Sequence, residues 1–168
     1  MAKKKDEKPA EAAPAPITGP GPMLQVLAQY TKDQSFENPN APESLRNDKG
    51  QPQINIQIEI GRQMLADDTV EVTLILKADA RREDQVAFIA ELEYAGLFAF
   101  QNMNLEQVQP MMMIECPRMI FPFLRRIISD VTRDGGFPPL NLDNIDFMQL
   151  YRNEIARRQG EAAAQPQN

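Results

Sequence analysis

Acidic side chains alternate along two stretches of the sequence, and their spacing suits the binding of a cationic protein surface. Asp33 and Glu37 share one parity in the first stretch, as do Ile89, Glu91 and Glu93 in the second. Successive side chains of a strand point to opposite faces, so each set would lie on one face of its strand. If the two faces coincide, they form a flat acidic patch with one exposed aliphatic residue. An ordinary solvated sheet face is the alternative.

A second candidate for binding is apolar sequence in excess of what two helices can cover. Some of this surface must pack against other subunits or against ligands. Methionine-rich surface also adapts to varied shapes and is favoured at promiscuous binding sites. Plain core or an oligomer interface is the alternative. The apolar segments are Ile54, Ile56, Ile58 and Ile60, then Leu97 to Phe100, Met111 to Ile114, and the pair Phe147 and Tyr151.

The residues of most enzyme mechanisms are missing. The chain has no histidine and no GxGxxG or GxxxxGK[ST] phosphate loop. Cys116 has no imidazole beside it, so a small buried hydrophobe is the simpler interpretation. Asp67 and Asp68 suit a polar hairpin turn better than a cation site. We therefore expect no enzyme activity, no catalytic, cofactor-binding or metal site, and no cofactor.

Period-two patterns predict the strands that position these residues. The clearest pattern runs from Gln53 to Ile60, and a similar one, broken by Ile75, runs from Thr69 to Ala80. A polar link between them favours an antiparallel hairpin. Further strands are predicted from about Gln85 to Phe98 and from Tyr30 to Glu37. Together they predict a four-stranded antiparallel sheet.

After Pro110 the apolar period changes to that of a helix. Pro117 and Pro122 should kink or restart this helix, and Gly135 with Gly136 supplies a left-handed stop. A last helix is predicted from near Asp143, whose carboxylate would cap its first turn. A sheet followed by a long kinked helix and a second C-terminal helix is an α+β fold.

Composition predicts one domain between two polar tails. The chain has 168 residues, of which 42% are apolar, a size typical of a single domain. Residues 1–22 are rich in Lys, Pro and Ala, and residues 159–168 are polar, so both tails are predicted to be disordered. The domain itself is predicted to span residues 23–158.

Charge and hydropathy limit the partners. The net charge of −6 repels phosphate backbones, so we expect no nucleic acid. No apolar run approaches the roughly 18 residues of a membrane span, and the N-terminus lacks the apolar part of a signal peptide. We therefore expect a cytoplasmic protein without direct membrane insertion, and the single cysteine fits a reducing compartment.

The stretch Tyr30-Thr-Lys-Asp-Gln-Ser-Phe-Glu-Asn-Pro-Asn-Ala-Pro42 closely resembles the first strand of the SecB family of protein-export chaperones. Three further blocks are similar to the same family, so that the resemblance covers about residues 25 to 155. The blocks are Leu65 to Asp68, Cys116 to Pro122, and Gly136 to Leu142 with Asn144 to Tyr151 after it.

The resemblance implies an ATP-independent holdase that binds unfolded preproteins and delivers them to the SecA motor. It also implies a homotetramer, a dimer of dimers, with the helix near Ile114 to Arg133 at the inner subunit interface. In the family, the zinc-bearing C-terminal tail of SecA binds the acidic sheet face. The matching positions for SecA binding are Asp33, Glu37, Ile89 and Glu91.

The family's client groove lies between the crossover loop, the second strand and the last helix. The residues that this implies for client binding are Ile54, Ile56, Ile58, Phe98, Phe147 and Tyr151. A general holdase unconnected to secretion, as in SecB-like chaperones that serve toxin-antitoxin pairs, has the same fold and groove. The acidic residues Asp33, Glu37 and Glu91 favour export.

Overall fold

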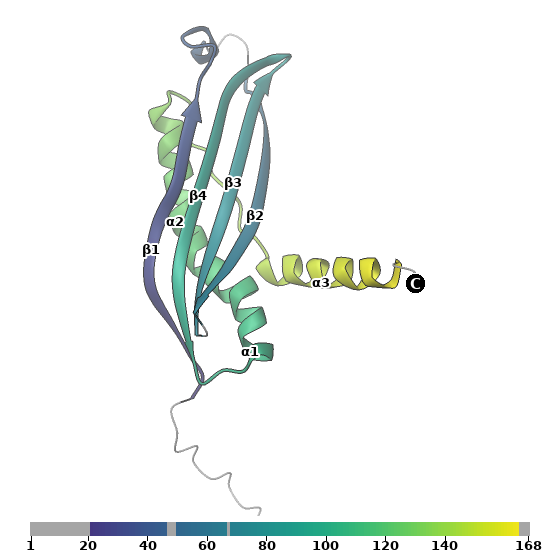
Figure 1. Ribbon diagram of the computed structural model, residues 1–168. Helices are drawn as coiled ribbons and strands as arrows, with labels where there is room; N and C mark the ends of the chain where they lie inside the picture. Colours follow the sequence, from purple (N-terminus) through teal and green to yellow (C-terminus); the bar gives the residue numbers. More distant parts are fainter. Residues whose placement is uncertain (1–20, 47–49, 67, 165–168) are drawn as a thin grey trace, which may run out of the picture.

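The computed structural model describes residues 21–46, 50–66 and 68–164, which form a four-stranded antiparallel sheet with helices packed on one side (Figure 1). In space the strands follow the order β1-β4-β3-β2. The predicted α+β fold is confirmed. The strands are β1 (Met23–Glu37), β2 (Gln53–Ala66), β3 (Thr69–Arg82) and β4 (Gln85–Gln101).

Strand β1 is longer than the sequence predicts, because it begins at Met23 and not near Tyr30. Two register shifts against β4, between Val26 and Ala28 and again before Asp33, interrupt its alternation. A β-bulge puts two residues of one strand opposite one of its partner, so the period-two pattern is lost at each bulge. The bulge between Val26 and Ala28 separates the start of β1 from the predicted stretch, whereas the bulge before Asp33 lies inside that stretch.

The sheet has one apolar face, which we call the inner face, and one polar face, which we call the outer face. Val70, Val72, Leu74 and Leu76 of β3 are 0% exposed on the inner face and form the centre of the core. Ile75, which breaks the sequence alternation, lies on the outer face between them.

The first helical region begins earlier than Pro110, where the apolar period places it. α1 (Leu105–Pro110) starts with a reciprocal cap, in which the Asn104 side chain accepts from the Gln107 amide and the Gln107 side chain accepts from the Asn104 amide, both at 3.0 Å. A π-helical segment, η3 (Met111–Glu115), then leads into α2 (Cys116–Asp134).

Helix α2 packs on β4, β3 and β1 at very close range. A Cβ at Gly96 of β4 would lie 2.5 Å from the Phe98 ring and 2.9 Å from Ile120 of α2, so only glycine fits there. Pro117 lies in the first turn of α2, where the α-helix begins after η3, and Pro122 lies inside α2 without ending it. After the helix, Gly136 supplies the left-handed backbone with φ 87°.

Helix α3 (Phe147–Ala164) starts at Phe147, not near Asp143. The capping group is Asp146, whose carboxylate accepts from the Gln149 amide at 3.0 Å, so the predicted cap at Asp143 is wrong. The helix also continues past residue 158, because Ala, Glu and Gln favour helix. It projects away from the sheet (Figure 1). Residues 1–20 and 165–168 of the two predicted tails lie outside the described residues.

Candidate functional site

The two predicted acidic sets meet on neighbouring strands of the outer face. In the β1 and β4 ladder, Asp33 is directly opposite Glu93, and Glu37 is directly opposite Ile89. Glu91 lies between them on β4. The residues that alternate with this set on β4, such as Leu92 at 1%, are buried in the core, so the acidic set faces outward. The structure thus places all four predicted SecA-binding positions side by side.

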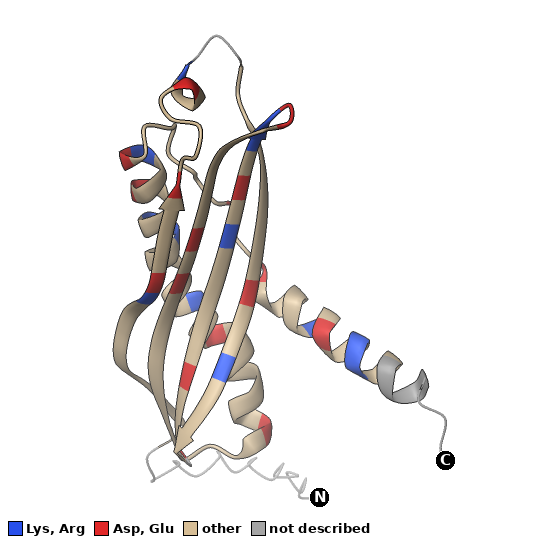
Figure 2. Cartoon of the chain, turned by 45° about the horizontal axis from the view of Figure 1, so that its top comes forward, with Lys and Arg blue, Asp and Glu red and all other residues tan. Residues whose placement is uncertain are grey.

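We call this surface the acidic face. It consists of Asp33, Glu37, Ile89, Glu91 and Glu93. Figure 2 shows acidic residues on adjacent strands of the sheet, with few basic ones among them.

Most of the negative charge on the acidic face is not neutralised. Glu91 pairs with Lys77 of β3 at 3.4 Å, but both side chains are about half exposed, and such pairs are weak. Among the residues that the structure describes, Asp33, Glu37 and Glu93 have no ion-pair partner. The face can therefore attract a cationic partner over the Debye length of about 8 to 10 Å.

A polar network that the sequence patterns did not reveal borders the acidic face. Glu71 of β3 accepts hydrogen bonds from the Tyr30 hydroxyl at 2.5 Å and from the Lys32 ammonium at 2.6 Å. The Thr73 hydroxyl donates to the same carboxylate at 3.4 Å. Tyr30 and Lys32 lie on β1, and nothing in the sequence spacing shows that they meet a β3 residue across β4.

The network changes the acidity of two of its members. Hydrogen bonds from Lys32 and Tyr30 favour the carboxylate and lower the pKa of Glu71. The bond to Glu71, together with burial, raises the pKa of Tyr30 to about 12, because the phenol loses a strong acceptor when it ionises. The lysine is thus held by a carboxylate that stays charged at neutral pH.

The predicted client residues of β2 lie on the opposite, inner face of the sheet. Ile54, Ile56 and Ile58 alternate there, and their β3 neighbours are buried core residues. Ile54 is 39% exposed and Ile56 is 38% exposed. Since β2 is the edge strand next to β3, these isoleucines extend the core surface outward as an open apolar row.

Two predicted client residues belong to the core instead. Phe98 is 0% exposed and Phe147 is 1% exposed, so neither side chain is accessible to a client. Phe147 packs edge-on against Phe121 of α2, with ring centroids 5.8 Å apart. This contact anchors α3 to α2. Tyr151, one turn later, is partly buried and packs against the same core.

Further exposed apolar residues lie outside the set predicted for client binding. They lie on the same two elements as most of the predicted set, β2 and α3. The β2 residues are Met64 and Leu65, and the α3 residues are Met148, Leu150 and Ile155. We call these five residues together with Ile54, Ile56, Ile58 and Tyr151 the apolar surface.

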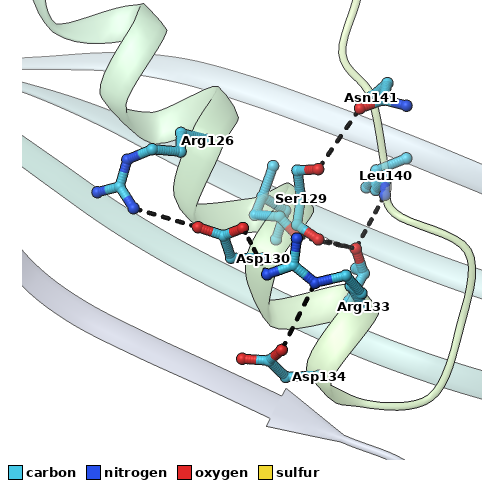
Figure 3. Close-up of polar contacts among 9 residues, drawn as sticks. Arg126, Ser129, Asp130, Arg133, Asp134, Leu140 and Asn141 are labelled. Carbon is cyan, nitrogen blue, oxygen red and sulfur yellow. Dashed lines mark hydrogen bonds and ion pairs between the residues drawn. The ribbon is translucent and has the colours of Figure 1, made fainter.

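Polar contacts at the end of α2 fix the segment that leads to α3 (Figure 3). The buried Thr132 hydroxyl donates to the Ile128 carbonyl at 2.9 Å and accepts from the Leu140 amide at 2.9 Å. Nearby, the Ser129 hydroxyl donates to the Asn141 side chain at 3.4 Å. These bonds hold the chain against α2 and so set where α3 begins.

A cavity of about 950 Å³ coincides with neither surface. It lies between the connection after β1 and the turn between β3 and β4, and polar side chains such as Asn40, Arg82 and Asp84 line it. The acidic face and the apolar surface are therefore open surfaces and not enclosed pockets.

The described residues show none of the features of a metal centre or a reactive thiol. No group of three or more metal-binding side chains occurs among them. Cys116 is buried, and burial raises the pKa of its thiol to about 12, which disfavours the nucleophilic thiolate. In the same part of the chain, no helix is both long enough and apolar enough to span a membrane.

Known proteins resemble the chain over most of its length. A family model described as preprotein translocase subunit SecB matches residues 18–158. The protein-export protein SecB of Rhodopseudomonas palustris (strain BisA53) is 52% identical over 147 residues, which cover 88% of this chain and 91% of that protein. That of Bradyrhizobium diazoefficiens is 53% identical over 150 residues, 89% of each chain.

A solved structure has a similar fold. It is a SecB-like chaperone of Mycobacterium tuberculosis in complex with a ChAD peptide from an antitoxin. The TM-score is 0.59 with 18% sequence identity, and the match covers 73% of this chain and 90% of that one. At this identity the likeness concerns the fold alone.

Proposed function

The chain belongs to the SecB family and is a non-enzymatic chaperone of protein export that binds client polypeptides, and we propose that it presents clients and motor with opposite faces of one sheet. Unfolded preproteins bind the apolar surface on the inner side, and the zinc-bearing tail of SecA binds the acidic face on the outer side. The observation that carries this proposal is the register that sets Glu37 opposite Ile89 and Asp33 opposite Glu93.

Client binding without ATP follows from the size of the contributions. Burying one Ile or Phe side chain gains roughly 1.5 to 3 kcal/mol, whereas ordering one client residue costs roughly 1 to 2 kcal/mol of backbone entropy. A single open row is therefore a weak site. Folding of the client buries the same apolar segments and competes with the chaperone directly, so no hydrolysis is needed.

Avidity across subunits would make this weak binding useful. We propose a homotetramer, in which one unfolded chain occupies several apolar surfaces and each further contact is intramolecular. Met119 and Phe123 of α2, 41% and 43% exposed, are candidates for the subunit contact because they form apolar surface on the helix that covers the sheet. Light scattering that gave a stable monomer at micromolar concentration would contradict this arrangement.

Delivery to SecA rests on charge. The acidic face attracts a cationic tail at long range, and Ile89 adds an apolar contact beside Glu91. A holdase not connected to export would not need this face. Preproteins await export in the cytoplasm, and we place the protein there.

The test asks whether client holding and SecA binding can be abolished separately. Full-length protein is assayed for delay of precursor folding without nucleotide and for binding of SecA. The double variant Asp33→Asn with Glu91→Gln should lose SecA binding and keep the folding delay, whereas Ile54→Asp with Ile56→Asp should do the reverse. Variants that lose both activities together, while remaining folded, would contradict the assignment of the two faces.

A further inference from the structure

We propose that Glu71 is a positioning residue for motor recognition, which holds Lys32 away from Asp33 and so keeps the acidic face negative. This inference rests on the proposed function of the acidic face. Glu71 itself lies on β3, beside that face and not in it.

A β-bulge in β1 places Lys32 on the same face of the sheet as Asp33. In regular strand, Lys32 and Asp33 would point to opposite faces. The register shift after Thr31 places both on the outer face: Asp33 opposes Glu93, and Lys32 bonds Glu71, whose neighbours Val70 and Val72 are core residues. A lysine therefore adjoins the carboxylate that the cationic partner is proposed to meet.

The register also shows toward which part of the sheet the Lys32 side chain extends. Glu71 pairs with Leu97 of β4, whereas Asp33 pairs with Glu93. Leu97 and Glu93 are four residues apart on β4, which corresponds to about 13 Å along the strand. The backbone of the anchoring residue is therefore displaced along the sheet from the Asp33 and Glu93 pair.

The surroundings of Glu71 favour a persistent contact with Lys32. The Glu71 side chain is 12% exposed, and its second oxygen is occupied by the Tyr30 hydroxyl. Ion pairs on open surface lose their geometry to side-chain entropy and solvent. Here a nearly buried acceptor with a fixed orientation receives the lysine, which distinguishes this pair from the half-exposed pair of Lys77 and Glu91.

Without Glu71, Lys32 would have two carboxylates close by: Asp33, the next residue in the chain, and Glu93, which pairs with Asp33. Among the described residues neither of these carboxylates has another ion-pair partner, so the freed ammonium would neutralise part of the acidic face. The partner's cation would then have to displace a lysine. Glu71 acts on recognition through Lys32 and has no need to touch the partner.

The test is a double-mutant cycle in the full-length protein, with binding of a zinc-loaded SecA C-terminal tail peptide measured by calorimetry. Glu71→Gln should weaken binding about fivefold, the effect expected of one new close charge at the surface. Lys32→Gln should change it less than about twofold, since this lysine is already paired in the parent. The double variant should recover parental affinity.

Glu59→Gln is the matched control, because it removes one outer-face carboxylate of β2 that forms no ion pair with a lysine of the described residues. Should Glu71→Gln behave like Glu59→Gln, or should Lys32→Gln fail to rescue it, the inference is wrong. Rescue also excludes simple unfolding of Glu71→Gln. Failure of the proposed function gives a different result, in which Asp33→Asn leaves peptide binding unchanged.

Discussion

Asp33 and Glu93 face each other directly across β1 and β4, although both are carboxylates. Like charges directly opposite each other in a sheet oppose strand pairing. The fold therefore tolerates a local destabilisation at the place where a cationic partner is proposed to bind. A bound cation would relieve the repulsion, so binding and sheet stability are coupled at this pair.

The first prediction concerns this repulsion. Asp33→Asn should raise the free energy of unfolding by roughly 0.2 to 1 kcal/mol while it weakens SecA binding. Glu37→Gln is the matched control, because Glu37 faces Ile89 and not a charge. It should weaken SecA binding without stabilising the protein. Urea unfolding at low salt measures the difference, and equal stabilities of the two variants would argue against repulsion.

The second prediction concerns Glu91. Glu91→Lys places a positive charge opposite Lys77 and against the proposed cationic partner. SecA affinity should fall, and its dependence on salt should become shallower, because less attraction remains to be screened. Suppression of client aggregation should persist. Loss of aggregation suppression with intact SecA binding would reverse the assignment.

The third prediction concerns Ile56. Ile56→Asp puts a charge into the open apolar row and should weaken client binding by roughly 1 to 3 kcal/mol where the client covers this residue. Gln57→Asp is the matched control, since the neighbouring side chain points to the outer face beside Lys77. Client affinity is measured on variants of unchanged assembly, and equal affinity in all three proteins would exclude Ile56 from the client surface.

The fourth prediction concerns the connection shown in Figure 3. Thr132→Val removes the acceptor of the buried Leu140 amide and should cost roughly 1 to 3 kcal/mol of unfolding free energy. Ser129→Ala breaks an exposed bond of the same connection, and its effect should stay within about 0.5 kcal/mol. Chemical denaturation compares them. Similar losses of unfolding free energy in both variants would mean that the buried bond contributes no more to stability than the exposed bond.

The fifth prediction concerns Tyr30 and alkaline pH. Its pKa in the folded protein is raised to about 12, so the bond to Glu71 contributes its full stability below the unfolded value near 10. That contribution is lost as pH rises from about 10 toward 12. The stability advantage of the parent over Tyr30→Phe should therefore shrink between about pH 10 and pH 12, since the other tyrosines cancel in the comparison. An advantage that grew with pH would contradict the bond.

Strands and faces were predictable where alternation is regular. The isoleucines from Ile54 to Ile60 identified β2, and the parity of Glu91 identified its polar face. The beginning of β1 was missed because the bulge between Val26 and Ala28 breaks the alternation there. The start of α1 was missed as well, because its reciprocal cap at Asn104 and Gln107 depends on two side-chain contacts and not on the apolar period used to find helices.

The sequence predicted which residues form the candidate site, but it did not show which of them lie next to each other. Parity placed Asp33 and Glu91 on polar faces, yet only the strand order β1-β4 shows that the faces coincide. The burial of Phe98 and Phe147 was not predictable, because an apolar side chain gives the same signal in a core and in a groove. The partnership of Lys32 with Glu71 spans two strands and a bulge, so no local pattern reports it.

The position of β1 in the sheet has a consequence for how the chain folds. β2, β3 and β4 are joined as successive hairpins, whose closure needs only short loops. β1 instead pairs Met23 with Gln101, a contact between residues far apart in the chain. Although β1 leaves the ribosome before the other three strands, its partner emerges last, so we expect β1 to dock last. A chaperone of unfolded chains thus carries its own first strand without its full partner until synthesis has passed Gln101.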